Sequence, residues 1–348
     1  MRRNSSGKTW KSIVIAVCSA GLVSAGLVTA QVSLATAEPT SSTQPGANGH
    51  SITIPIVHGP AQNSPIKAKH FDRSNPGRAP HGANDPACTS TSSYPILLAH
   101  GTDATAYTDF AYLAPELRKR GYCVFALNYG VGKPGINLSP STGVDAPTFG
   151  TKDIRKSARE VADAVTRIRA TTGANKVHLI GFSQGANVTR YYVNKLGGAS
   201  VVDAWVGIAS PTYGSDAFSP ILRIPGGEEL AANVLAPALI QQISGSSFLH
   251  ELNWPTDTVP GVRYTTISTD FDEVISPVTN IPLRGESQHF SLQSVCPYDM
   301  SGHFQLSFNP VVLELTLHAL NPEHIPVVEC RFVPPGVGLI DTFIASNS

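Results

Sequence analysis

The fold of this chain is most constrained by an alternation of short apolar runs with segments of helical periodicity. The run at 95–99 is continuously apolar, as is typical of a strand that is buried on both faces of a sheet. Further on, 152–170 repeats apolar residues at helical spacing, and Gly173 follows as a helix stop. Strands that alternate with helices predict an α/β fold, with a mostly parallel sheet and helices on both of its faces.

The same patterns give the remaining elements. Strands are expected at 95–99, 122–127, 176–182, 201–209, 262–268 and 289–295. Helices are expected around 110–117 and over 152–170, 186–196 and 304–320. A chain of 348 residues can form one large α/β domain or two small ones.

Charged side chains are balanced, with 25 Lys and Arg against 25 Asp and Glu, so the formal net charge is zero. A chain without a basic excess does not attract nucleic acid, and no acidic run suggests a store of cations. We therefore expect an uncharged partner and no nucleic acid.

The N-terminus has the three-part pattern of a secretory signal peptide. Basic residues precede an apolar run over 13–28, and Ala35-Thr36-Ala37 follows as a cleavage site. We expect residues 1–37 to be removed, the protein to be secreted, and no membrane span to remain; an uncleaved membrane anchor is the alternative. Residues 38–87 are rich in Pro, Gly and Ser and predict a linker and N-terminal extension. The α/β domain then covers 88–348.

Five cysteines are present, and Cys18 is lost with the signal peptide. An even number in an exported chain implies disulfides, with three possible connectivities for four cysteines. The two nearest-neighbour pairs, Cys88–Cys123 and Cys296–Cys330, would each close a loop within one half of the fold. Four free thiols or a zinc site are the alternatives, and the lack of any C-x-x-C spacing disfavours zinc.

The segment Gly181-Phe182-Ser183-Gln184-Gly185 matches the G-x-S-x-G pattern of a nucleophile elbow. The pattern alone is weak, but here an expected strand precedes it and an expected helix follows it. The sharp turn between strand and helix needs glycines where a Cβ would collide, and it raises the central hydroxyl above the sheet. Ser183 is therefore the predicted nucleophile.

A serine nucleophile needs a base to take its proton and an acid to orient that base, and in this fold both follow the serine. His303 lies between the last expected strand and the last expected helix, where catalytic residues gather in an open α/β sheet. His289 starts a strand and His318 is within a helix, so His303 is the predicted base. His100 and Asp103 precede Ser183 and are interpreted as loop structure.

The acid is expected after strand 262–268, where Asp270, Asp272 and Glu273 are candidates. Charge that develops on a carbonyl oxygen also needs two or more fixed donors. The backbone N–H of Gln184 is one, and the N–H and hydroxyl of Thr102, in the loop after the first strand, are the others.

Residues 211–253 interrupt the alternation just after the elbow with an apolar helical stretch. Because insertions of this length are usually functional, they predict a small helical cap over the site; an ordinary peripheral helix pair is the alternative. No H-E-x-x-H motif or dinucleotide-binding glycine pattern is present, so we expect no metal and no organic cofactor.

These motifs together resemble secreted lipases of the α/β-hydrolase superfamily, and the bacterial class 2 and fungal lipase B types are the most similar. The resemblance covers about 88–335 and rests on four segments: 95–102, 182–185, 272–277 and 291–303. Residues 38–87 have no evident counterpart, the segment 211–253 matches only loosely, and His100 stands where lipase B has proline.

The resemblance implies that Asp272 is the acid of a triad with Ser183 and His303. It implies an oxyanion hole at Thr102 and Gln184, and the two disulfides given above. The implied activity is that of a secreted serine carboxylic ester hydrolase, similar to triacylglycerol lipases, that cleaves lipid esters through an acyl-enzyme. The expected partner is a small-molecule or lipid ester, free or at a lipid–water interface. A secreted acyltransferase with the same triad is the alternative, and a non-catalytic binding protein is a third.

Overall fold

The computed structural model describes residues 41–45, 51–88, 93–132, 148–216, 219–222, 224–225, 227, 231 and 235–338. All of them belong to one compact unit, Pro39–Ser348. The predicted signal peptide, with Cys18, lies outside the described residues, as do parts of the predicted cap segment. None of the helices in the described ranges is long and apolar enough to cross a membrane.

A six-stranded parallel sheet forms the centre of the fold, in the order β4-β3-β5-β6-β7-β8. Its strands are β3 (Ile96–Ala99), β4 (Val124–Leu127), β5 (Val177–Phe182), β6 (Val202–Ile208), β7 (Arg263–Ser268) and β8 (Gln288–Ser291). The parallel sheet predicted from the apolar runs is thereby confirmed. A separate antiparallel pair joins β1 (Ser41–Pro45) and β2 (Ser51–Pro55).

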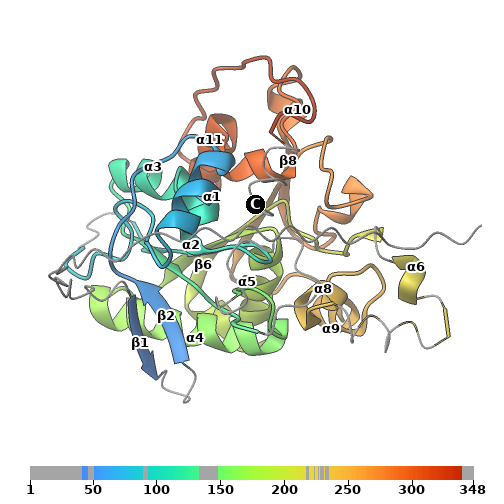
Figure 1. Cartoon of the computed structure of the whole chain (residues 1–348), viewed down its shortest axis with the longest axis horizontal. Coiled ribbons are helices and arrows are strands. Elements are labelled where there is room, and N and C mark those ends of the chain that lie inside the picture. Colours follow the sequence, from blue (N-terminus) through green and yellow to red (C-terminus); the bar gives the residue numbers. More distant parts are fainter. Residues whose placement is uncertain are drawn as a thin grey trace, which may run out of the picture. The chain divides into compact units, whose positions relative to one another are not determined.

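Helices cover both faces of the sheet, because alternate residues of each buried strand point to opposite sides. Leu97 faces a core shared with α4 (Ile154–Thr172) and α5 (Gln184–Lys195). Its neighbour Leu98 faces a core shared with α2 (Ala106–Phe110), α3 (Leu113–Lys119) and α11 (Pro310–Leu320). Figure 1 shows these helices around the sheet. Gly173 ends α4 with a φ of 70°, as predicted.

Three expected elements differ from the structure. The helix expected at 304–320 is a 3-10 helix, η4 (His303–Phe308), followed by α11, because Asn309 caps α11 with its side chain and Pro310 occupies the first helical position. The strand expected at 289–295 ends at Ser291, and a single helical turn, α10 (Leu292–Val295), follows. The helix expected around 110–117 is two short helices, α2 and α3.

Part of the predicted N-terminal extension is folded against the sheet domain. It contains β2 and a ten-residue helix, α1 (Pro65–Ser74), which its Pro- and Gly-rich composition does not predict. Asn84 exchanges hydrogen bonds of 2.8 Å with both backbone groups of Ala126 on the edge strand β4. An open strand edge is prone to pair with other chains, and Asn84 occupies part of this one.

The segment 211–253 contains α6 (Ser219–Leu222), α8 (Pro237–Gln241) and α9 (Ser247–Asn253). Phe248, Leu249 and Leu252 of α9 are buried in the same core as α4 and α5. Helix α9 is therefore a part of the helical layer, and a cap over the site remains a prediction for the rest of the segment. The remaining short elements are η1 (Gly198–Ser200) and η3 (Val278–Asn280).

Two disulfides are present, and they are the pairs predicted above. Cys88–Cys123 connects the N-terminal stretch to the residue before β4, and Cys296–Cys330 connects the end of α10 to the C-terminal segment. Each bond closes a loop of about 35 residues, which restricts the unfolded chain and stabilises the fold by about 3–4 kcal/mol in a chain-entropy model.

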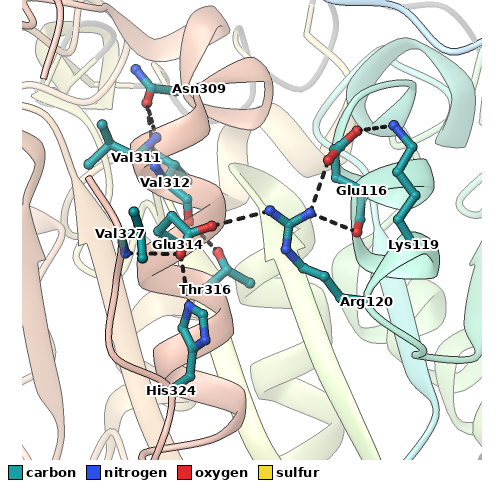
Figure 2. A network of polar contacts seen from close by, with 10 residues as sticks. All are labelled: Glu116, Lys119, Arg120, Asn309, Val311, Val312, Glu314, Thr316, His324 and Val327. Atoms are coloured by element: carbon teal, nitrogen blue, oxygen red, sulfur yellow. Dashed lines mark hydrogen bonds and ion pairs between the residues drawn. The ribbon is translucent and has the colours of Figure 1, made fainter. Parts of the chain in front are cut away.

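A polar network connects α3, α11 and the C-terminal segment (Figure 2). Arg120, which directly follows α3, donates to Glu116 of α3 and to Glu314 of α11, the latter at 3.2 Å. Glu314 also accepts hydrogen bonds from the His324 ring at 2.8 Å and the Val327 N–H at 3.2 Å. Burial alone raises the pKa of Glu314, but these hydrogen bonds and the charges of His324 and Arg120 outweigh it and hold the pKa below its ordinary value.

Replacing Glu314 with Gln should lower the thermal unfolding midpoint by about 2–4 °C at pH 7, because a partly exposed ion pair contributes about 1 kcal/mol at most. A carboxyl whose folded pKa is depressed stabilises the fold above its unfolded pKa and loses that effect as the pH falls through its folded pKa. The difference from the unsubstituted protein should therefore close in acid. Glu329→Gln is the control, because Glu329 and its partner Arg331 are 77% and 76% exposed. A constant difference at all pH values would contradict the assignment.

Candidate active site

The turn between β5 and α5 holds Ser183 in a backbone conformation that non-glycine residues rarely adopt. Its φ is 52° and its ψ is −123°. Such a conformation costs on the order of 1–3 kcal/mol and persists only where the surroundings enforce it. Here the Ser183 N–H donates to the Ile208 carbonyl at 2.8 Å, which fixes the turn to the end of β6. Strain of this kind is typical of functional sites.

The two glycines of the motif are required by close backbone approaches. A Cβ on Gly181 would lie 2.3 Å from the Ala186 nitrogen, and one on Gly185 would lie 1.9 Å from the Ala99 carbonyl oxygen. Any side chain at either position would therefore push α5 away from β3 or open the turn.

His303 lies beside this turn. It is the first residue of η4, is 2% exposed, and its ring centroid is 5.2 Å from that of Phe182. Its Nδ1 is 2.9 Å from Oδ2 and 3.0 Å from Oδ1 of Asp272. Because an ionised carboxylate only accepts, Nδ1 carries the proton of this hydrogen bond and Nε2 is the nitrogen that remains for another partner.

The three candidate acids lie in different places. Asp272 binds His303, and its Oδ1 also accepts the N–H groups of Val274 and Ile275 at 2.9 and 2.7 Å. Asp270 is exposed and accepts a hydrogen bond from the Ser291 hydroxyl. Glu273 accepts the backbone N–H of His303 at 2.8 Å, so it holds the loop that carries the imidazole.

Opposing effects set the proton affinity of His303. Burial alone lowers its pKa, but the charge and hydrogen bond of Asp272, with the charges of Glu273 and Asp109, outweigh burial and leave the pKa above its ordinary value. The imidazolium form is therefore stabilised by carboxylates that are already in place, as a general base requires.

Buried polar residues that no sequence motif predicted support the His303 loop. Asp299 is 4% exposed and accepts hydrogen bonds from the backbone and hydroxyl of Ser301 and from the Asn309 amide. Thr269, at the end of β7, donates to the Ser301 carbonyl at 2.7 Å. The only sequence signal for these residues is their closeness to His303 and Asp272 in the chain.

Thr102 and Gln184 are in contact. The Gln184 amide is fully buried and donates to the Thr102 hydroxyl at 2.7 Å and to the Gly150 carbonyl at 2.8 Å. Gln242, which follows α8, donates to the same hydroxyl at 3.1 Å. Since Thr102 Oγ1 accepts from two amides, its own proton is free to point at a third group. The segment 211–253 thus reaches this loop through Gln242.

Residues 93–315, more than half of the chain, match the family described as Lipase (class 2). The chain belongs to the class 2 lipase family.

The chain is also similar to solved structures. The crystal structure of Aspergillus fumigatus lipase B superposes with a TM-score of 0.56 at 22% identity, over 77% of this chain and 63% of that one, so this chain spans less than two thirds of that protein. The mature Bacillus licheniformis lipase BlEst2 has a TM-score of 0.46 at 14% identity, over 69% of this chain and 96% of that one. The likeness to lipase B concerns the α/β-hydrolase fold alone. No curated protein matches the chain.

The histidines His100, His289 and His318 of this class 2 lipase form contacts away from Asp272. His100 is fully buried and stacks on Tyr129, its Nδ1 lies 2.8 Å from the Gly101 carbonyl, and burial lowers its pKa to about 4. His289 of β8 lies 2.9 Å from the Thr266 hydroxyl, and His318 of α11 lies 2.8 Å from the His324 carbonyl.

Replacing Asp272 with Asn should move the pKa of His303 below its ordinary value, because the largest effect that raises it is lost while burial remains. An NMR titration of the imidazole in the folded protein measures this directly. Asp270→Asn is the control, since Asp270 does not bind His303, and it should leave the titration nearly unchanged. An unaltered midpoint in the Asp272 variant would mean that this carboxylate does not govern the imidazole.

Proposed function

We propose that this class 2 lipase hydrolyses lipid esters through an acyl-enzyme on Ser183, with His303 as general base and Asp272 as the acid that orients it. The observation that carries the proposal is the buried hydrogen bond between His303 and Asp272, formed beside the strained turn of Ser183. A nucleophile, an orienting acid and a base, in this chain order, fit the α/β-hydrolase arrangement.

In the acylation step, His303 Nε2 takes the hydroxyl proton of Ser183 as Oγ forms a bond to the ester carbonyl carbon. The bond between that carbon and the alcohol oxygen then breaks, and the imidazolium returns its proton to the leaving alcohol. A water molecule repeats the sequence on the acyl-enzyme and releases the carboxylic acid and Ser183. Asp272 stays ionised throughout and stabilises the imidazolium.

We propose that Thr102 and Gln184 hold the negative charge of the tetrahedral intermediate. Gln184 is the first residue of α5, so its N–H is one of the unpaired donors at the start of that helix. The Thr102 hydroxyl accepts two amide hydrogen bonds, which supports the orientation of its proton toward a further acceptor. Protein groups alone supply every step, so the proposal needs no metal and no organic cofactor.

We further propose that the protein is secreted and acts on lipid esters, free or at a lipid–water interface. The signal-peptide pattern over 1–37 supports export, and the two disulfides are consistent with an oxidising compartment. The zero net charge agrees with a neutral substrate. Rates with p-nitrophenyl esters of graded acyl length will define which chain the site accepts.

Ser183→Ala should reduce hydrolysis of p-nitrophenyl esters by on the order of 10⁶-fold and abolish labelling by a fluorophosphonate probe, because the nucleophile is lost. Circular dichroism and the unfolding midpoint should show an intact fold. The matched control is Ser200→Ala, which removes an exposed hydroxyl that bonds only locally to Gly197. Retained turnover in the Ser183 variant would end the proposal.

Thr102→Val removes the hydroxyl at nearly constant volume and should lower kcat by about 10²-fold with little change in KM, as for the loss of one oxyanion donor. Thr102→Ser keeps the hydroxyl and should recover most of the rate. Full activity in Thr102→Val together with a loss in Thr102→Ser would indicate that packing of the methyl group, rather than the hydroxyl, matters at this position.

A further inference from the structure

Helix α1 lies against the parts of the chain that carry both catalytic loops. Ala68 of α1 packs with Tyr107 of α2 and Phe308 of η4, and the Phe71 ring lies 5.1 Å from that of Tyr107. Helix α2 follows the loop of Thr102, and η4 begins with His303. Figure 1 shows α1 beside α2. A helix in this position can influence the oxyanion loop and the imidazole together.

One buried carboxylate of α2 binds the oxyanion loop directly. Asp109 is 7% exposed, and its Oδ2 accepts the Gly101 N–H at 2.7 Å. A Cβ on Gly101 would lie 3.3 Å from this oxygen and 3.3 Å from the Ser183 Cβ, so the carboxylate and the nucleophile adjoin the same residue. Asp109 also interacts electrostatically with His303.

The charge of Asp109 is balanced from α1. Burial raises its pKa to about 6, while the Gly101 hydrogen bond and the charges of Lys69 and His303 act in the opposite direction. Lys69 is half-buried, and burial lowers the pKa of its ammonium while the charges of Asp109, Asp103 and Asp72 act in the opposite direction. Asp72 in turn accepts a hydrogen bond from Thr105, the N-cap of α2, at 3.2 Å. The start of α2 is thus tied to α1 by a hydrogen bond, and Asp109 interacts with α1 through the charge of Lys69.

We propose that Asp109 is a positioning residue that holds the Gly101-Thr102 loop in its oxyanion-binding geometry, and that Lys69 of α1 is its counter-charge. The proposal rests on the function proposed above. Oxyanion donors act because they are fixed before charge develops, and a hydrogen bond to an ionised acceptor holds a backbone N–H more strongly than one to a neutral acceptor. Helix α1 has no evident counterpart in the lipases that the chain resembles, and it thereby contributes to the geometry of the site.

Asp109→Asn keeps the shape and an acceptor oxygen but removes the charge. It should lower kcat by up to about tenfold at pH 8 with KM unchanged, and Asp109→Ala should lower it by about 10- to 100-fold, because the interaction acts on the transition state. The acidic limb of kcat/KM should also move to lower pH in Asp109→Asn. A base must be neutral to act, and loss of a nearby negative charge lowers the pKa of His303.

Lys69→Met should move the acidic limb of the kcat/KM profile to higher pH. Without the ammonium, the charges of Asp109 and Asp103 act unopposed, so the pKa values of His303 and Asp109 rise and activity appears at higher pH. Lys67→Met, on the exposed side of the same helix, is the matched control and should leave the profile unchanged.

Asp257→Asn is the control for a merely structural acid, because Asp257 also accepts backbone N–H groups, from Arg284 and Gly285. It should lower the unfolding midpoint without moving the limb.

If Asp109→Asn and Lys69→Met both have the kcat of the unsubstituted enzyme, and the acidic limb of kcat/KM lies at the same pH in all three, the inference is wrong. If both variants lose activity only in proportion to a lower unfolding midpoint, the role of these residues is structural and the inference is also wrong. In either case the proposed function stands as long as the unsubstituted enzyme is active and Ser183→Ala is not. Should Asp109→Ala fail to fold, the Asn variant alone decides.

Discussion

The close approach of α5 to β3 is the contact on which the remaining geometry of the site depends. Gly185 lies so near the Ala99 carbonyl that a Cβ would overlap with it, and a Cβ on Gly181 would overlap with the first turn of α5. With both ends of the turn fixed, the intervening Ser183 is forced to a positive φ and is held there by its hydrogen bond to Ile208 of β6. Three neighbouring parallel strands therefore enforce a conformation that an isolated peptide would leave at once.

A second regularity is the way in which the surrounding loops are held. Each is fixed by a carboxylate that accepts a backbone N–H: Asp109 binds Gly101, Glu273 binds His303, and Asp299 binds Ser301. Loops at the carboxyl ends of parallel strands have no sheet partners for their own N–H groups, and an ionised oxygen is the strongest acceptor available. The cost is a concentration of negative charge near the site, which Lys69 and His303 partly offset.

The strands and the elbow follow from local patterns, because a buried parallel strand must be apolar at successive positions and a strand-to-helix turn needs glycines. The sequence also contains a signal for the start of α11, because Asn309-Pro310 is typical of a helix N-terminus. The helical periodicity on both sides of these two residues predicted one continuous helix instead. Asp109 and α1 could not be predicted in this way. Asp109 directly precedes Phe110 at the start of the expected helix, and no motif distinguishes it there. Its partner Lys69 is forty residues away, in a stretch whose composition indicates a linker.

Two histidines of this lipase show that burial alone does not make a base. His100 and His303 are 0% and 2% exposed, and they lie beside Gly101 and Phe182, respectively. Burial lowers the pKa of His100 to about 4, because only the Gly101 carbonyl opposes it. The same desolvation acts on His303, yet the pKa of His303 rises, since Asp272, Glu273 and Asp109 surround it. His100 stays neutral, stacks on Tyr129 and is hydrogen-bonded to the Gly101 carbonyl, while His303 can accept a proton. The carboxylates that face each ring, which come from distant parts of the chain, therefore distinguish the two roles.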